Sequence, residues 1–156
     1  KANAAPISQR SMHKQGADMP YETFFAYTGN TNWGIQNLEY DPHSGYWFTA
    51  VYPGSKPEFE NFRMFAIDGA VSAKETLLEG RGTETGLLLT SAKIGCGQKN
   101  DRIYGSHFLH GSTGIASLGD GSFYISENGR IEGEKLFFTH IHRYFFDPVH
   151  PDWFRL

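Results

Sequence analysis

Two segments of the chain repeat one pattern eighty positions apart. Residues 34–48 and residues 114–125 each begin with Gly-Ile, carry Leu three positions after the Ile, pass through an acidic turn with Gly, and end in an aromatic run. Such a segment is typical of two antiparallel strands joined by a tight turn. A chain that uses this hairpin twice is constrained to a fold of antiparallel sheets.

Composition favours strands over helices. The chain has 156 residues, the length of one ordinary domain, and 39% of them are hydrophobic, which is enough for a core. It has 18 Gly, 8 Tyr and 13 Phe, and it has no long run of helix-forming residues. We therefore predict a mainly β fold.

Charge and cysteine content exclude several classes of partner and site. The 14 basic and 17 acidic side chains give a net charge of −3 without a long block of one sign, so the sequence predicts no nucleic-acid partner. No apolar run approaches the roughly 20 residues that span a bilayer, so it predicts no membrane partner. A lone cysteine, Cys96, excludes an intrachain disulfide and a thiolate zinc site.

Proline and turn residues divide the chain. Residues 1–20 show no sustained period and end at a proline, which predicts an N-terminal arm. Residues 21–156 are expected to form a single all-β domain with repeats at about 21–80 and 86–146 and a proline-containing C-terminal tail. The first residue, Lys1, is typical of a processed, tagged or truncated product.

Three local patterns predict individual elements. Residues 46–52 read as a strand that is apolar on both faces, so we expect it to lie between two sheets, with residues 35–40 as its hairpin partner. Asn128-Gly129 predicts a turn after the second hairpin. For residues 72–78 a helix capping box suggests a short helix, whereas the repeat favours a strand at 75–78.

Residues 34–52 and 114–127, about a fifth of the chain, resemble the blades of β-propeller proteins, in particular secreted bacterial propellers that act on carbohydrates. The chain has neither a WD dipeptide nor an Asp-box. Since a blade needs roughly 40–50 residues, the resemblance implies a partial propeller of two to three stacked blades. Its open edges would be covered within a longer protein or by further copies of the chain. The alternative is a small β-sandwich.

The resemblance also implies where a ligand binds. In a blade, the strand after Gly-Ile lies nearest the central axis, so the residues before it line the channel mouth. An exposed aromatic ring beside amide, hydroxyl and imidazole groups suits a sugar. The predicted ligand-binding residues are Asn32, Trp33, His107, His110, Ser112 and Thr113. The alternative is that the Asn and Thr residues build turns and that Trp33 fills a gap in the core.

Carboxylates within the repeats suggest an enzymatic version of this site. Two carboxyl groups at a suitable separation can hydrolyse a glycosidic bond. If the protein is an enzyme, we expect Glu39, the least turn-like of these residues, to act with Asp120 as acid and base. The alternative for Asp120 is structural, because Asp beside Gly in a turn commonly binds its own backbone.

His140 and His142 lie two positions apart in a predicted strand, so both side chains emerge on one face. A third ligand, such as His107 or His110, would complete a metal site. A hydrogen-bonded or solvent-facing pair is the interpretation that we favour. The sequence predicts no metal and no cofactor.

Two functions follow from these patterns. The first is a carbohydrate-binding or carbohydrate-processing domain, for which the resemblance implies a secreted or periplasmic location and further blades or copies of the chain as partners. The second is a non-enzymatic protein-interaction module that oligomerises through its sheet edges and uses the aromatic loop at residues 53–62.

Overall fold

The structure is a computed structural model that describes residues 22–94 and 103–156. The predicted N-terminal arm and Cys96 lie outside the described residues. The described part contains eleven β-strands and no helix, which confirms the mainly β prediction. Among these residues there is accordingly no helix with the length and apolar character that crossing a bilayer requires.

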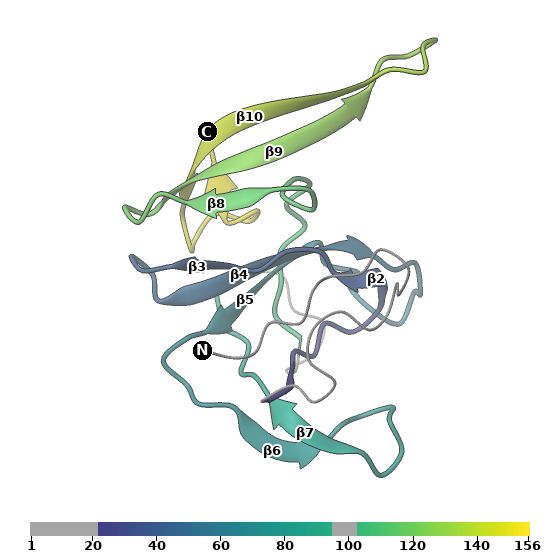
Figure 1. The fold of residues 1–156 in the computed structure, drawn as a ribbon, viewed down its shortest axis with the longest axis vertical. Helices are drawn as coiled ribbons and strands as arrows, with labels where there is room; N and C mark the ends of the chain where they lie inside the picture. The colour runs from purple at the N-terminus through teal and green to yellow at the C-terminus, as the bar shows by residue number, and fades with distance from the viewer. Residues whose placement is uncertain (1–21, 95–102) are drawn as a thin grey trace, which may run out of the picture.

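A middle sheet contains the first repeated hairpin (Figure 1). Its central strand is β4 (Tyr46–Pro53), which pairs antiparallel with β2 (Thr31–Ile35) and β3 (Glu39–Asp41) on one edge and with β5 (Met64–Asp68) on the other. The hairpin predicted from the Gly and Asp turn signals is therefore present, and its second strand is the central strand of the sheet.

The edge formed by β2 and β3 is interrupted where one continuous strand was predicted. Ile35 pairs with Val51 and Glu39 pairs with Phe48, so both short strands run along the same side of β4. Between them, the Asn37 side chain replaces a strand partner, because its Oδ1 accepts a hydrogen bond of 2.9 Å from the Ala50 backbone N–H. The prediction of one strand at residues 35–40 is wrong in this respect.

An upper sheet contains the second repeated hairpin. It consists of β8 (Ile115–Ser117), β9 (Ser122–Arg130), β10 (Phe137–Phe146) and β11 (Phe154–Arg155), in the antiparallel order β11-β10-β9-β8. The predicted turn at Asn128-Gly129 is wrong, because β9 continues to Arg130. Gly129 instead lies opposite Phe138, whose ring occupies the space that a side chain at position 129 would need.

A lower sheet has the order β1-β7-β6. β1 (Phe24–Phe25) pairs in parallel with β7 (Thr85–Leu88), and β6 (Lys74–Leu77) pairs antiparallel with β7. Of the two alternatives for residues 72–78, the strand is therefore correct and the helix is not. The connection from β6 to β7 is short, whereas β1 reaches β7 from a distant part of the chain.

The centre of β4, from Phe48 to Val51, is buried on both faces, as its two-sided apolar pattern predicts. Phe48 and Ala50 point into a large core shared with the upper sheet, where Phe123 and Phe154 meet them. Val51, on the opposite face, belongs to a small core. The remaining buried members of the small core are Phe62, Phe65 and Ile103.

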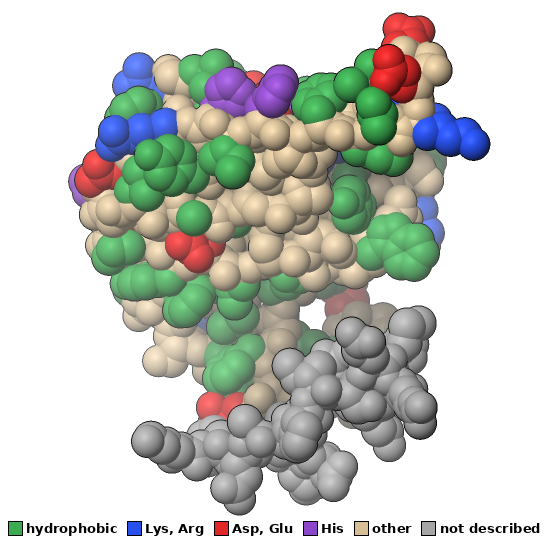
Figure 2. Space-filling view, turned by 45° about the horizontal axis from the view of Figure 1, so that its top comes forward, with side chains coloured by type: hydrophobic (Ala, Val, Ile, Leu, Met, Phe, Trp, Pro, Cys, Tyr) green, Lys and Arg blue, Asp and Glu red, His purple; other side chains and the backbone are tan. Residues whose placement is uncertain are grey.

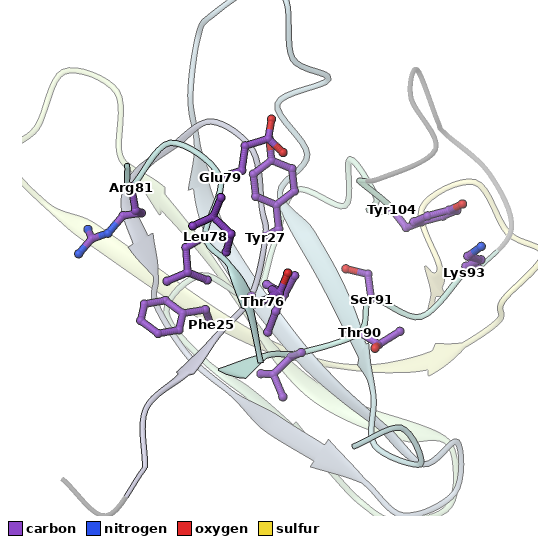
Figure 3. Close-up of a pocket in the computed structure, with 14 residues that line it drawn as sticks. Phe25, Tyr27, Thr76, Leu78, Glu79, Arg81, Thr90, Ser91, Lys93 and Tyr104 are labelled. Atoms are coloured by element: carbon purple, nitrogen blue, oxygen red, sulfur yellow. The ribbon is translucent and has the colours of Figure 1, made fainter. Parts of the chain in front are cut away.

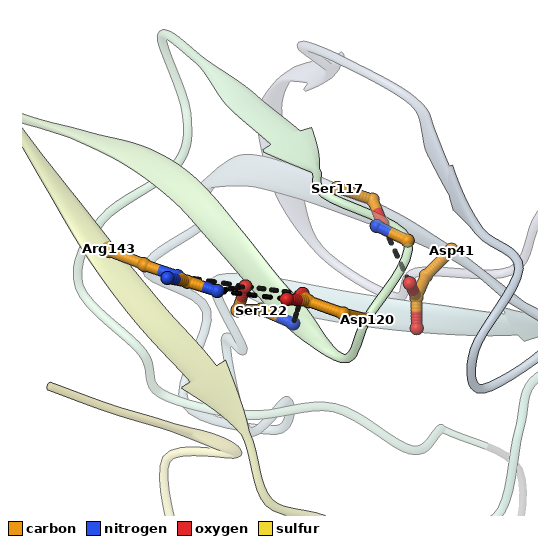
Figure 4. Close-up of polar contacts among 6 residues, drawn as sticks. Asp41, Ser117, Asp120, Ser122 and Arg143 are labelled. Atoms are coloured by element: carbon orange, nitrogen blue, oxygen red, sulfur yellow. Dashed lines mark hydrogen bonds and ion pairs between the residues drawn. The ribbon is translucent and has the colours of Figure 1, made fainter.

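The two repeated hairpins lie side by side through their first strands, β3 and β8 (Figure 1). The backbone N–H of Ser117 donates a hydrogen bond of 2.8 Å to Oε1 of Glu39. The Ser117 hydroxyl donates a second bond, of 2.6 Å, to Oδ1 of Asp41 (Figure 4). Side chains of β3 thus fasten the middle sheet to the upper sheet.

Candidate functional site

A cavity of about 220 Å³ opens where the end of β4 meets the loop before β8 and the outer half of β9. Most of its walls are polar. They are formed by Val51, Tyr52, Arg63, Leu109, His110, Ser112, Ser126 and Asn128. We call this space the polar cavity.

The loop that carries His110 and Ser112 is fixed at Gly111. The Gly111 N–H donates a hydrogen bond of 3.2 Å to the Ser126 carbonyl of β9, and the Asn37 side chain donates one to the Gly111 carbonyl. Gly111 has a φ of +94°, in the region that favours glycine. The loop is therefore held between the upper and middle sheets, with His110 and Ser112 facing the polar cavity.

A carboxylate cluster adjoins the polar cavity and consists of Glu127, Tyr144, His110 and His142. Tyr144 donates a hydrogen bond to Oε1 of Glu127. The Nε2 atom of His110 lies 3.8 Å from Oε2 of Glu127, and the Nε2 atom of His142 lies 3.9 Å from Oε1. His110 belongs to both features and connects the carboxylate to the cavity.

The hydrogen bond from Tyr144 lowers the pKa of Glu127. Partial burial opposes this shift, and positive charge on His110, His142 and His140 adds to it. Burial, together with the bond to Glu127, raises the pKa of Tyr144. At neutral pH the cluster therefore presents an anionic, hydrogen-bond-accepting Glu127 beside a neutral phenol.

Hydroxyl and amide groups form a second network on the side of β9 that borders the polar cavity. The hydroxyls of Thr113 and Ser126 lie 2.6 Å apart. Asn128 donates from its Nδ2 atom to the Thr113 hydroxyl, and its Oδ1 accepts a bond of 2.7 Å from Thr139. These bonds fix the Asn128 amide at the cavity wall.

Trp33 lies on the edge strand β2, one residue after Asn32, whose strand partner Tyr52 lines the polar cavity. Its side chain is 87% exposed, so the alternative that Trp33 fills a core gap is wrong. Its φ is +63°, in a strand interrupted by a bulge. A bulky residue in the left-handed region is strained, and such strain concentrates at functional positions.

The other predicted ligand-binding residues are distributed unevenly. His110 and Ser112 line the polar cavity, and Thr113 contacts its wall. Asn32 donates its side-chain N–H to the Pro53 carbonyl at 3.0 Å. His107 does not line the cavity, and the centroid of its ring lies 5.0 Å from that of the Phe62 ring.

The two predicted catalytic carboxylates bind groups of the chain itself. Glu39 accepts the 2.8 Å bond from the Ser117 N–H. Asp120 accepts bonds from Ser122 and from Arg143, whose Nη2 atom lies 2.9 Å from Oδ2 (Figure 4). The hydrogen bond from Ser122 is the main reason that the pKa of Asp120 is lowered. The geometry of Asp120 matches the local turn bonding that was its structural alternative.

His140 and His142 emerge on one face of β10, as their spacing predicts, with ring centroids 6.0 Å apart. Histidine side chains gather beside hydrophobic ones on this side of the molecule in Figure 2. Within residues 22–94 and 103–156, no group of three or more His, Cys, Asp or Glu side chains is arranged to hold a metal ion.

Sequence reasoning missed the roles of Glu127, Tyr144 and Asn128. The wrongly predicted turn at residues 128–129 ended β9 too early, so His140 and His142 were considered as a metal pair and not as neighbours of Glu127. The signal that could have found the cluster is the length of the aromatic strand at 137–146, which requires an equally long partner. That pairing sets His140 opposite Glu127.

No protein-family profile, no curated protein and no solved structure matches this chain.

Proposed function

We propose that this chain is a carbohydrate-binding domain whose ligand lies in the polar cavity and stacks on Trp33. The observation that carries the proposal is an 87% exposed Trp with a strained backbone on the strand beside a cavity walled by imidazole, amide, hydroxyl and guanidinium groups. Sugars present apolar C–H faces and hydroxyl groups, which such a site contacts with a ring and with hydrogen-bonding side chains.

The size and charge of the site support a sugar. A cavity of about 220 Å³ is smaller than the roughly 300–1,000 Å³ typical of drug-sized ligands, so it suits one ring of a longer chain. Arg63 and Ser112 can donate hydrogen bonds to hydroxyl oxygens. Glu127, held anionic by Tyr144, accepts hydrogen bonds and adjoins the cavity through His110.

A glycan array followed by titration calorimetry tests this function. Trp33→Ala is expected to weaken binding of the best oligosaccharide roughly tenfold, because an aromatic stacking contact is lost. Trp47→Ala is the matched control, since Trp47 is also partly exposed but lies on β4 beside Tyr40, away from the cavity walls. Failure to bind any glycan, or equal effects of the two substitutions, would contradict the proposal.

In the enzymatic version of this function, Glu39 and Asp120 act as acid and base on a part of the sugar that extends beyond the polar cavity, because neither residue lines it. Glu39→Gln is the sharp test, because the Gln side-chain oxygen can still accept the Ser117 N–H and preserve folding. We expect the wild type to hydrolyse a bound oligosaccharide. We expect the Glu39→Gln variant to lose this activity while its thermal unfolding stays unchanged. If Glu39→Gln hydrolyses the oligosaccharide at the wild-type rate, Glu39 is not a catalytic residue.

We also propose that the sheets are blades of a partial propeller from a secreted or periplasmic protein. The three sheets lie one above another in Figure 1, and the first strands of the two repeated hairpins are neighbours. Neighbouring blades around a channel have this relationship. No sheet in the described part of the chain closes on itself, so further blades or further copies would cover the open edges.

The second candidate function is a non-enzymatic protein-interaction module. The outer half of β10 favours it, because Phe137 and Ile141 are 79% and 68% exposed beside a strand edge that no described strand covers. Sedimentation of wild type against an Ile141→Lys variant tests it. Self-association of the wild type together with a monomeric variant would support this function. A wild type that is monomeric and binds no other protein would contradict it.

A further inference from the structure

A second cavity, of about 480 Å³, lies on the lower sheet, apart from the polar cavity (Figure 3). Its volume falls within the roughly 300–1,000 Å³ range of small-molecule sites. No residue lines both cavities. We call it the lower cavity, and what it binds does not depend on the proposed carbohydrate site.

Apolar side chains of the lower sheet form most of its walls. Phe25 of β1 and Leu88 of β7 are register partners, and Leu78 follows β6 on the same wall. Gly86 makes this arrangement possible, because a Cβ at position 86 would lie 2.6 Å from the Phe25 ring. The glycine leaves room for the ring to lie against the sheet.

Charged groups lie at both ends of the lower cavity, with Glu79 and Arg81 on one side and Lys93 on the other. Figure 3 shows Lys93 and Tyr104 at one end, Phe25, Leu78 and Arg81 at the other, and the Ser91 side chain between them. The cavity therefore has apolar walls along Phe25, Leu78 and Leu88, and Lys93 is the charged group at the end away from Arg81.

Lys93 is the cation of this cavity that remains available to a ligand. Its Nζ atom lies 5.6 Å from the centroid of the Tyr104 ring, and no carboxylate of the described residues pairs with it. Arg81, at the other end, is bound to Glu84 at 2.8 Å. Within the described chain, the hydroxyl of Ser91 also has no hydrogen-bond partner. An anionic group at the Lys93 end would meet a positive charge and a free hydroxyl donor.

We propose that the lower cavity binds a small amphipathic carboxylate, with its apolar body against Phe25, Leu78 and Leu88 and its acid group at Lys93 and Ser91. The apolar walls favour a ligand with an apolar body, because binding removes the apolar surface of that body from water. The lone ammonium selects a single negative charge by a charge-assisted hydrogen bond. An uncharged molecule of the same length satisfies only the first of these requirements.

The test is titration calorimetry of the full chain with decanoate, below the concentration at which it forms micelles, and with decanol. Decanoate is expected to bind wild type more tightly than decanol does. Lys93→Met is expected to weaken decanoate roughly fivefold, because one partly solvated ion pair is lost, and to leave decanol unchanged. Lys135→Met, at the exposed tip of the β9–β10 hairpin, is the matched control and should change neither affinity.

A second variant tests the cavity itself. Ser91→Phe fills the space beside Lys93 and should abolish binding of both probes while the unfolding midpoint shows that the chain still folds. Three results would overturn the proposal: no decanoate binding to wild type, equal effects of Lys93→Met and Lys135→Met, or full binding by a folded Ser91→Phe variant.

Discussion

Ser117 and Asp41 join the two repeated hairpins, because the Ser117 hydroxyl on β8 donates a 2.6 Å hydrogen bond to the carboxylate of Asp41 on β3. Asp41 has no exposed surface. Its second oxygen accepts a 2.9 Å bond from the Ser44 N–H within the first turn. One buried carboxylate therefore closes the turn of the first hairpin and holds the second hairpin beside it.

Removing the Ser117 hydroxyl should destabilise the protein. Ser117→Ala leaves a buried carboxylate oxygen without a donor, which costs about 1–3 kcal/mol of the free energy of unfolding. Urea denaturation followed by Trp fluorescence measures the loss. Ser72→Ala, at an exposed position before β6, is the control and should change the free energy by less than about 0.5 kcal/mol. Equal effects of the two substitutions would mean that the bond does not hold the hairpins.

Acid should destabilise the protein through Asp41. Burial raises the pKa of Asp41, but bonds from Ser117 and Ser44 outweigh it and leave the pKa below the ordinary 3.8. A carboxyl whose pKa is lowered by folding stabilises the folded state above its unfolded pKa. That stabilisation is lost as pH falls below about 3.8 and through the folded value. Denaturation midpoints measured from pH 6 to pH 2 should therefore decline more steeply at the acid end for wild type than for Asp41→Asn.

Replacing Trp33 should separate stability from binding. Trp33→Asn keeps a residue type that tolerates a φ of +63° and removes a ring that contributes little to the core. We expect the free energy of unfolding to stay the same or to rise by up to about 1 kcal/mol. Carbohydrate binding should fall in the same variant. A loss of more than about 1 kcal/mol would show that the ring packs in solution and that the strain argument is wrong.

Removing the phenol of Tyr144 should change the acidity of Glu127. In Tyr144→Phe the main cause of the lowered pKa is absent, so the pKa of Glu127 should rise toward its ordinary 4.5. A carbon-detected NMR titration of the glutamate carboxyl groups measures this shift. Tyr124→Phe is the control, because Tyr124 lies on β9 but points to its exposed face. If the titration of Glu127 is unchanged in Tyr144→Phe, the hydrogen bond from Tyr144 does not lower the pKa of Glu127.

Local chemistry was sufficient to predict the hairpins and the central strand. Gly45 and Gly121, both at positive φ, form turns where the sequence indicated them, and the two-sided apolar pattern of β4 predicted its burial. The parallel pairing of β1 with β7 could not be predicted in the same way. It joins Phe24 to Leu87, far apart in the chain, and no local pattern encodes such a contact.

The candidate site was predictable only in part, for a related reason. His110 and Ser112 precede a Gly-Ile strand entry, and their position there was enough to place them near a common opening. The contacts of Glu127 with Tyr144 and His142 depend on the register between two long strands. The positive φ of Trp33 has no sequence signal either, because bulky residues rarely adopt it.

The burial of the centre of β4 on both faces has a consequence for how the protein unfolds. Phe48 on one face and Val51 on the other belong to different cores but to the same strand. Detaching the upper sheet exposes the Phe48 side of β4 to water, and detaching the segments that carry Phe62 and Ile103 exposes the Val51 side. The two cores therefore cannot unfold independently, and melting should be a single cooperative event in which neither core outlasts the other.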